Sequence, residues 1–321
     1  KEHIALNGLK IQTLDHVRPS VRVALSLTCP GTAQVSILDG DRELTQAACK
    51  CQPGGTVDIP LPDAELWSLD NPKCYTCRVV FGEDVREETF GIRTVTCDSK
   101  HGFCLNGKRV ILRGACIHHD NGILGAITLP DAEMRKVRLL KQAGYNAIRS
   151  THNPCSKALL DACDTLGMLV LDEYTDMWYI HKTRYDYAQY MPERWREDLS
   201  ALVDKDFNHP SVVMYSIGNE VSEPAEKKGV DLAREMVEFL HEADASRPVT
   251  GGMNLMIISR SAKGNDIYKE EGGRSDDGAA KTQGMNSTIF NMMTSMVGTG
   301  MNKGANGKKA DEVTAPVLDA L

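Results

Sequence analysis

The chain has 321 residues, of which 41% are hydrophobic and 25% charged, and it carries a formal net charge of -7 with a pI near 5.8. Its Lys and Arg residues are scattered, so it lacks the clustered basic surface that phosphate binding needs, and no nucleic acid partner is expected. It contains no apolar stretch long enough to span a membrane, so no membrane partner is expected, and its length suits two domains.

The first 92 residues have the pattern of a small β-sandwich. Apolar and polar side chains alternate over 21–27, 33–38 and 75–80. Turn signals separate these runs at Pro30-Gly31, Asp39-Gly40 and Pro53-Gly54-Gly55. Short alternating strands between turns are typical of sandwiches. The pattern changes near Phe90-Gly91-Ile92, so we predict one domain over 1–92 and a second over 93–321.

Strands and helices alternate five times in the second domain. Short, largely apolar runs predict strands buried on both faces, at 110–113, 146–149, 168–171, 212–217 and 248–251. Helical spacing predicts a helix opened by a capping box of Thr128 and Asp131, one closed by Gly167, one from about Pro192, and one from Pro224 to Ala243. This order indicates a parallel sheet with crossover helices, as in a (β/α)8 TIM barrel.

Five strands do not close a barrel that needs eight. The chain starts with Lys1 rather than Met and ends within a helix-like run, so we expect a fragment of a longer protein whose TIM barrel is incomplete. The stretch 259–310 is rich in Gly, Asn, Ser, Lys and Met. We interpret it as an irregular insertion at the barrel rim, with a short helix near 287–296, or as disorder.

Polar side chains follow each predicted strand. In chain order they are His118 and Asp120, His152 and Asn153, Asp172 and Glu173, Asn219 and Glu220, and Asn254, which follows the apolar Met253. Reactive side chains of a barrel come from the carboxyl ends of its strands, so these are expected to meet at one rim. Carboxylates, amides and imidazoles together suit a sugar, and acetal hydrolysis needs two carboxyl groups. Glu220 is the candidate acid, with a pKa raised by burial.

Each candidate also has a structural interpretation. Glu220 suits a helix cap or an ion pair as well as catalysis, and His152 suits the core. Trp178 and Tyr179, in the loop after Glu173, suit packing or a sugar-stacking platform.

The sequence favours neither a metal nor a cofactor. His118 and His119 are neighbours on an extended segment and face opposite ways, as do Cys74 and Cys77. A metal-dependent hydrolase would need further histidines, yet none follows His241. The ten cysteines lie mostly inside predicted elements and look reduced, which favours the cytoplasm. The oligomeric state is left open, including a homo-oligomer.

Six segments, in order, resemble glycoside hydrolase family 2. They are Phe90-Gly91-Ile92-Arg93-Thr94, Leu105-Asn106-Gly107-Lys108, Leu112-Arg113-Gly114 through His118-His119-Asp120, Arg149-Ser150-Thr151-His152-Asn153-Pro154, Leu171-Asp172-Glu173, and Asn208-His209-Pro210-Ser211-Val212 through Gly218-Asn219-Glu220. The resemblance covers about residues 65 to 255. The run from Leu66 to Pro72 is similar to part of that family's immunoglobulin-like domain, so the resemblance implies an immunoglobulin-like sandwich at 1–92.

The resemblance implies a retaining exo-acting β-glycosidase, with an oligosaccharide or β-glycoside as its partner. It makes Glu220 the general acid/base and Asn219 the partner of the sugar 2-hydroxyl. Further substrate-binding residues are His118, Asp120, His152, Asn153, Glu173, Asp176 and Trp178. Met177 and Tyr179 stand where magnesium-binding members carry an acidic residue and a histidine, so no metal is expected. The segment around Asp176 and Trp178 favours a β-galactosidase over a β-glucuronidase or β-mannosidase.

The family's nucleophile is a second Glu at the end of the seventh barrel strand. Glu270, Glu271 and Glu312 follow no apolar strand, so none of them is a substitute. We therefore predict that these 321 residues alone are inactive while the parent protein hydrolyses glycosides. A non-catalytic carbohydrate-binding protein is the alternative from another class.

Overall fold

The structure is a computed structural model that describes residues 3–268. The described residues form two compact units by their internal contacts. The first unit contains 3–173, 200–215 and 241–248, and the second contains 174–199, 216–240 and 249–268. The predicted insertion at 259–310 lies outside the described residues from 269 onward, and so does the helix predicted near 287–296. The division into domains at residue 92 stays a prediction.

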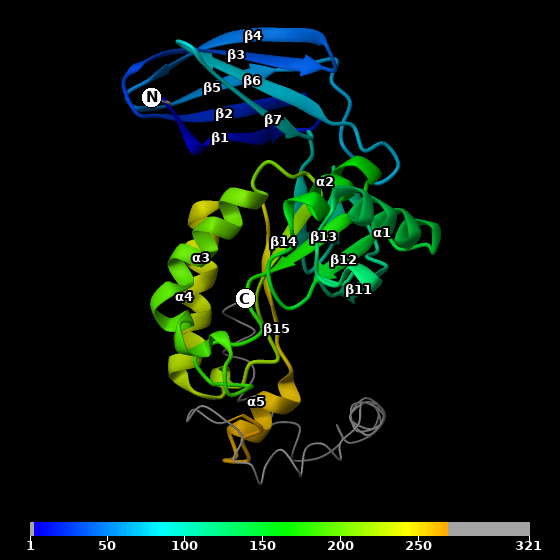
Figure 1. Cartoon of the computed structure of the whole chain (residues 1–321), viewed down its shortest axis with the longest axis vertical. Coiled ribbons are helices and arrows are strands. Elements are labelled where there is room, and N and C mark those ends of the chain that lie inside the picture. The colour runs from blue at the N-terminus through cyan, green and yellow to red at the C-terminus, as the bar shows by residue number, and fades with distance from the viewer. Residues whose placement is uncertain (1–2, 269–321) are drawn as a thin grey trace. The chain divides into compact units, whose positions relative to one another are not determined.

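Seven antiparallel strands build the sandwich in two sheets (Figure 1). One sheet has the order β1-β2-β5, with β1 (Ile4–Asp15), β2 (Ser20–Leu27) and β5 (Gly54–Pro60). The other has the order β4-β3-β6-β7, with β4 (Arg42–Cys51), β3 (Gly31–Asp39), β6 (Tyr75–Phe81) and β7 (Asp84–Phe90). The three strands expected from alternation lie within β2, β3 and β6. Their inward positions form one buried core that includes Val21, Val23, Val35, Ile37 and Val79.

A small antiparallel sheet follows the sandwich and was not predicted from the sequence. Its order is β10-β9-β8, formed by β8 (Val95–Asp98), β9 (Gly102–Leu105) and β10 (Lys108–Arg109).

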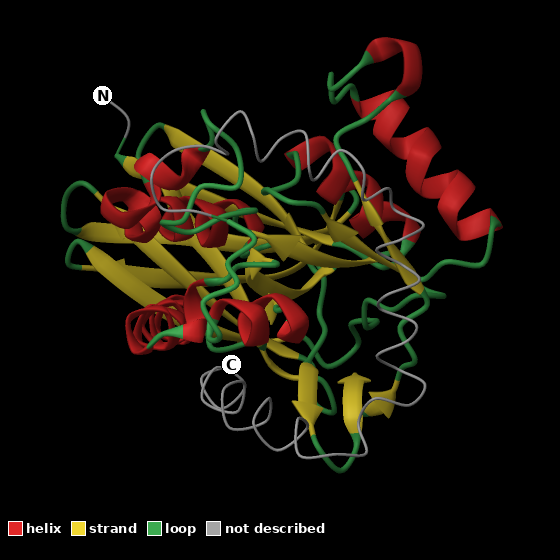
Figure 2. Cartoon of the chain, turned by 90° about the horizontal axis from the view of Figure 1, so that it is seen from below, coloured by secondary structure: helices red, strands yellow, loops and turns green. Residues whose placement is uncertain are grey.

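Five strands in chain order then form one sheet, and this confirms the expected partial barrel. They are β11 (Gly114–Ile117), β12 (Ala147–Ser150), β13 (Leu169–Glu173), β14 (Val212–Asn219) and β15 (Val249–Gly252). The ladders of β12 with β11 and with β13 are parallel. Helices alternate with the strands (Figures 1 and 2): α1 (Pro130–Gln142), α2 (Lys157–Leu166), α3 (Met191–Asp206), α4 (Lys227–Ala243) and α5 (Leu255–Ser261). Short 3-10 helices lie at Gly122–Leu124, Tyr187–Gln189 and Glu223–Ala225. None of the helices in the described part of the chain has both the length and the apolar character to cross a membrane.

The first parallel strand lies later in the chain than predicted. The apolar run 110–113 is not a strand, and pairing with β12 starts at Gly114. The Asn146 side chain takes the place of a strand partner, because its amide donates to the Ile111 carbonyl at 2.9 Å and accepts from the Arg113 N–H at 2.7 Å. An apolar run can therefore be extended without joining the sheet.

The capping box expected at Thr128 is also wrong. Helix α1 starts at Pro130, and its N-cap, Leu129, makes no side-chain hydrogen bond. Proline at the first helical position has a suitable φ and lacks an N–H that would need a partner, so it replaces the cap. By contrast, Gly167 ends α2 as predicted, with a left-handed φ of 71°.

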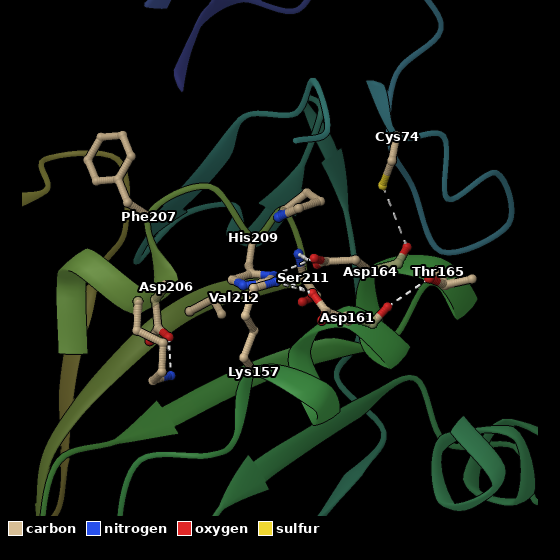
Figure 3. A network of polar contacts seen from close by, with 12 residues as sticks. Cys74, Lys157, Asp161, Asp164, Thr165, Asp206, Phe207, His209, Ser211 and Val212 are labelled. Atoms are coloured by element: carbon tan, nitrogen blue, oxygen red, sulfur yellow. Dashed lines mark hydrogen bonds and ion pairs between the residues drawn. The ribbon is translucent and has the colours of Figure 1, made fainter. Parts of the chain in front are cut away.

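The carboxylate of Asp164, near the end of α2, organises the segment that leads into β14 (Figure 3). One oxygen lies 2.5 Å from His209 Nδ1 and the other accepts from the Ser211 N–H at 3.0 Å. The Asp164 carbonyl accepts from the Trp67 indole N–H at 2.9 Å. Trp67 belongs to the segment between the sandwich strands β5 and β6, so this residue joins the sandwich to the barrel within the first unit.

Two buried arginines hold the first residue of β14. The Val212 carbonyl accepts from Arg93 Nη2 at 2.7 Å and from Arg247 Nε at 2.8 Å, and Arg93 Nε donates to the Pro210 carbonyl at 3.0 Å. Arg247 is paired with the buried carboxylate of Asp244. Burial, together with the nearby charge of Arg247, lowers the pKa of Arg93 to about 9. The start of this strand is therefore fixed by charge-assisted hydrogen bonds.

Candidate active site

The end of β14 is shaped by a close contact with Trp178. The Trp178 indole N–H donates to the Ile217 carbonyl at 2.8 Å. A Cβ on Gly218 would lie only 2.7 Å from that indole nitrogen, so only glycine fits between Ile217 and Asn219. Trp178 is 0% exposed. A ring with no exposed face cannot stack on a sugar in this conformation, so the predicted stacking role of Trp178 is wrong for this structure. Trp178 instead supports the end of β14 by packing.

Glu220 follows β14 with an unusual backbone. Its φ is +46°, in the left-handed region that few residues with a side chain adopt and that costs about 1–3 kcal/mol. Its N–H donates to the Gly252 carbonyl at 2.6 Å. Its half-buried carboxylate accepts from Asn254 Nδ2 at 3.0 Å, and no cation within residues 3–268 pairs with it. Outliers of this kind cluster at functional sites, and here the outlier orients a carboxyl group.

Asn219 is held by a group of polar side chains in the same unit. Its amide Nδ2 donates to Asp176 Oδ1 at 2.9 Å. Lys182 Nζ lies 2.7 Å from the same Asp176 oxygen and donates to the Asn219 carbonyl at 2.5 Å. Two residues predicted to bind substrate, Asp176 and Asn219, are thus brought together. Lys182 completes the group and was not predicted.

Buried hydrogen bonds fix the loop that supplies Asp176, Trp178 and Lys182. The buried Glu223 carboxyl accepts from the Ile180 N–H at 2.8 Å, and burial raises the pKa of Glu223. The hydroxyl groups of Tyr174 and Tyr187 donate to the same Asp198 oxygen at 2.8 and 2.9 Å. These contacts tie both ends of the loop to rigid elements, which preorganises the side chains it carries.

A second group of predicted residues meets in the first unit. The Glu173 carboxylate is buried, lies 2.7 Å from His152 Nδ1 and accepts from Arg149 Nε at 2.8 Å. The His118 ring contacts His152 edge-on, with centroids 5.6 Å apart. Glu173 therefore orients His152 beside His118, and Arg149 balances its charge.

Other strand-end residues have local structural roles. Asp172 is buried, accepts from the Cys155 N–H at 3.0 Å and lies 2.8 Å from Lys205 Nζ. Asp120 is exposed and accepts from the Gly122 N–H at 2.7 Å in a turn, and Asn153 is also exposed. Within residues 3–268, the side chains of Asp120 and Asn153 make no hydrogen bond or ion pair with His118 or His152, so their roles stay predictions.

One cluster of the described residues has the chemistry of metal ligands. Ligand atoms of Asp161, Asp164 and His209 lie within 4.8 Å of one another. The Asp164 carboxylate already serves His209 and Ser211, and Asp161 is paired with Lys157 at 2.7 Å. The cluster precedes β14, whereas the sugar-binding candidates follow the strands, so the structure assigns it to the sandwich–barrel junction.

Comparisons with known proteins agree with this architecture. The TIM-barrel domain of glycosyl hydrolases family 2 matches residues 97–271. The chain is 37% identical over 235 residues to the beta-galactosidase BoGH2A of Bacteroides ovatus, which covers 62% of the chain and 28% of that relative. It is 35% identical over 214 residues to a putative beta-glucuronidase of Formosa agariphila, covering 65% of the chain and 20% of the relative. A solved family 2 glycosyl hydrolase from Bacteroides cellulosilyticus superimposes with a TM-score of 0.74 at 39% identity, over 79% of the chain and 35% of the other. The chain thus spans about a third or less of these proteins.

Proposed function

Because the chain belongs to glycoside hydrolase family 2, we propose that the protein carrying it is a retaining exo-β-glycosidase that removes terminal β-linked sugars, with β-galactosides ranked first. The proposal depends on the position and contacts of the Glu220 carboxyl group. It is a carboxyl group that follows a barrel strand with φ +46°, is held by Asn254 through one oxygen, and has no ion-pair partner in the described part of the chain. A cation in an ion pair would favour the charged form of a carboxyl group and oppose the protonated form that a general acid needs, so the absence of such a partner among the described residues supports the proposal.

In the proposed mechanism Glu220 acts twice. It first protonates the glycosidic oxygen as the bond to the leaving group breaks, and it then removes a proton from the water that hydrolyses the glycosyl-enzyme. Asn219 accepts a hydrogen bond from the sugar 2-hydroxyl, because its amide nitrogen already faces Asp176. His118 and His152 contact other hydroxyl groups of the terminal sugar.

Retaining hydrolysis also needs a nucleophilic carboxylate about 5 Å from the acid. Glu270, Glu271 and Glu312 lie outside the described residues. We propose that the nucleophile comes from a later barrel strand of the parent protein, and that these 321 residues alone do not turn over glycosides.

The choice of sugar follows from the relatives and from the segment around Asp176. A relative named as a beta-galactosidase matches at 37% identity, which supports the galactoside. Relatives named as beta-glucuronidases, at 35% and 26% identity, support a glucuronide as the second candidate. A β-mannoside is the third candidate from the same family.

The test is turnover of 4-nitrophenyl β-galactoside, β-glucuronide and β-mannoside by the whole protein and its Glu220→Gln variant. Removing a general acid/base lowers the rate roughly 10²- to 10⁴-fold. Glu226→Gln is the matched control, since Glu226 is exposed and its side chain makes no hydrogen bond in the described structure. Hydrolysis that Glu220→Gln leaves unchanged would refute the assignment of Glu220. Sugar binding without hydrolysis of any glycoside would instead support a non-catalytic carbohydrate-binding protein.

A further inference from the structure

Lys182 places a positive charge among the residues that hold the end of β14. It lies in the loop between β13 and α3, and its side chain is only 9% exposed. Burying an ammonium group costs several kcal/mol unless it is paired and hydrogen-bonded. A lysine whose aliphatic chain only packs on the loop would keep its ammonium group in water. The buried ammonium group of Lys182 therefore indicates a specific function for its charge.

Within residues 3–268, the contacts of the Lys182 ammonium group lie in the second unit. Nζ is 2.7 Å from Asp176 Oδ1 and 2.5 Å from the Asn219 carbonyl oxygen, and it lies 5.4 Å from the centroid of the Tyr268 ring. Asp176 Oδ1 also accepts from Asn219 Nδ2. Lys182 therefore acts on Asn219 in two ways. It binds the Asn219 backbone carbonyl directly, and it shares the Asp176 oxygen that binds the Asn219 side chain.

The backbone on either side of Nζ is also fixed. The N–H groups of Lys182 and Thr183 donate to Asp186 Oδ2 at 2.7 and 2.8 Å, and His181 Nδ1 lies 2.7 Å from the other Asp186 oxygen. The lysine thus extends from an anchored turn, and little conformational freedom remains to be lost when its ammonium group binds.

We propose that Lys182 is a positioning residue of the glycosidase, which sets the Asn219 amide for the sugar 2-hydroxyl. Its charge keeps the Asp176 carboxylate as an acceptor, Asp176 fixes the Asn219 nitrogen, and the amide oxygen is then directed away from Asp176. Its second hydrogen bond holds the Asn219 carbonyl, immediately before the left-handed backbone of Glu220. The inference rests on the proposed function and deepens it.

The role has a consequence that simple support of the fold does not have. Hydrogen bonds to the 2-hydroxyl strengthen in the transition state of glycoside hydrolysis. Loss of Lys182 should then lower kcat more than it raises KM, and only for substrates that carry a 2-hydroxyl group.

The experiment compares two substrates with two variants of the whole protein. The substrates are the 4-nitrophenyl β-glycoside that the wild type hydrolyses best and its 2-deoxy analogue. The variants are Lys182→Met and, as the control, Lys227→Met, which removes an exposed lysine paired with Asp231 at the start of α4. Losing one charge-assisted hydrogen bond predicts a fall of roughly 10- to 100-fold in kcat/KM for Lys182→Met with the 2-hydroxy substrate, mostly in kcat. With the 2-deoxy substrate the fall should be under about threefold, and Lys227→Met should match the wild type with both.

Equal losses on both substrates would overturn the inference, because Lys182 would then support the fold without acting at the 2-hydroxyl. If Lys182→Met does not fold, as judged by circular dichroism, Lys182→Gln is measured instead and the same comparison decides. A wild type that hydrolyses no glycoside would overturn the proposed function itself, which is a different result from equal losses.

Discussion

The substitution Gly218→Ala tests whether Trp178 and β14 fit together as tightly as their contacts indicate. The added Cβ would lie 2.7 Å from Trp178 Nε1 and 3.3 Å from Cε2. Trp178 is completely buried, so the indole has no open space into which it can shift. Either the indole or the strand must then move, and the hydrogen bond from Nε1 to the Ile217 carbonyl is lost.

Two costs add in this variant. Overpacking a filled interior costs about 1–3 kcal/mol, and leaving a buried indole N–H without a partner costs about 1–3 kcal/mol. Replacing glycine by alanine stabilises the chain by about 0.5 kcal/mol through the unfolded state, which offsets little of this. We therefore expect Gly218→Ala to lower the free energy of unfolding by about 3 kcal/mol. Since Asn219 and Glu220 follow directly, glycoside turnover should also fall.

The assay is urea unfolding of the whole protein, followed by tryptophan fluorescence. Gly54→Ala is the matched control, because Gly54 also lies in a strand and a Cβ there would meet only the Leu25 carbonyl oxygen at 3.8 Å. With a slope of about 3 kcal/mol per M, the midpoint of Gly218→Ala should lie about 1 M below that of the control. Equal midpoints and equal turnover for the two variants would refute the packing argument.

Two further predictions concern carboxylates of the first unit. Asp164→Asn removes an acceptor from His209 or Ser211 and should destabilise by about 2–3 kcal/mol in urea unfolding. Asp161→Asn, which breaks an exposed ion pair, should cost under about 1 kcal/mol, and similar losses in both variants would contradict the junction role. Burial opposes ionisation of Asp244, but Arg247 and Ser246 outweigh it and lower its pKa from 3.8 to about 2. This contributes about 2 kcal/mol of stability above pH 4 that is lost as pH falls toward 2. The stability difference between wild type and Asp244→Asn should therefore narrow over that range, and a constant difference would be inconsistent with the lowered pKa.

The elements that sequence reasoning located well are those where local pattern and tertiary packing agree. The apolar run 212–217 predicted β14 correctly. A strand that is buried along nearly its whole length, as Val212–Asn219 is, needs apolar residues on both faces, and these are visible in the sequence. Gly167 ends α2 as expected. Another residue there would have a strained left-handed φ, and its Cβ would lie 2.6 Å from the Leu69 carbonyl oxygen.

The rest depended on partners that are distant in sequence. The run 110–113 is as apolar as a strand, but the Asn146 side chain holds it outside the sheet. Trp178 in a loop was expected to suit stacking as well as packing, and its burial against β14 decides for packing. Lys182 belongs to no periodic pattern, and its importance becomes visible only when Asp176 and the Asn219 carbonyl are seen on either side of it.

Arg93 and Arg247, which both donate to the Val212 carbonyl, limit how far this protein can be shortened. An engineer seeking a minimal catalytic barrel would delete residues 1–92, and with them Thr13, which accepts from the Arg93 N–H at 3.1 Å, and Trp67, which donates to Asp164. Arg93 would remain, but without the neighbours that set its direction toward the Pro210 and Val212 carbonyls. Strand β14 begins at that point, so truncation of the sandwich would loosen the start of this strand.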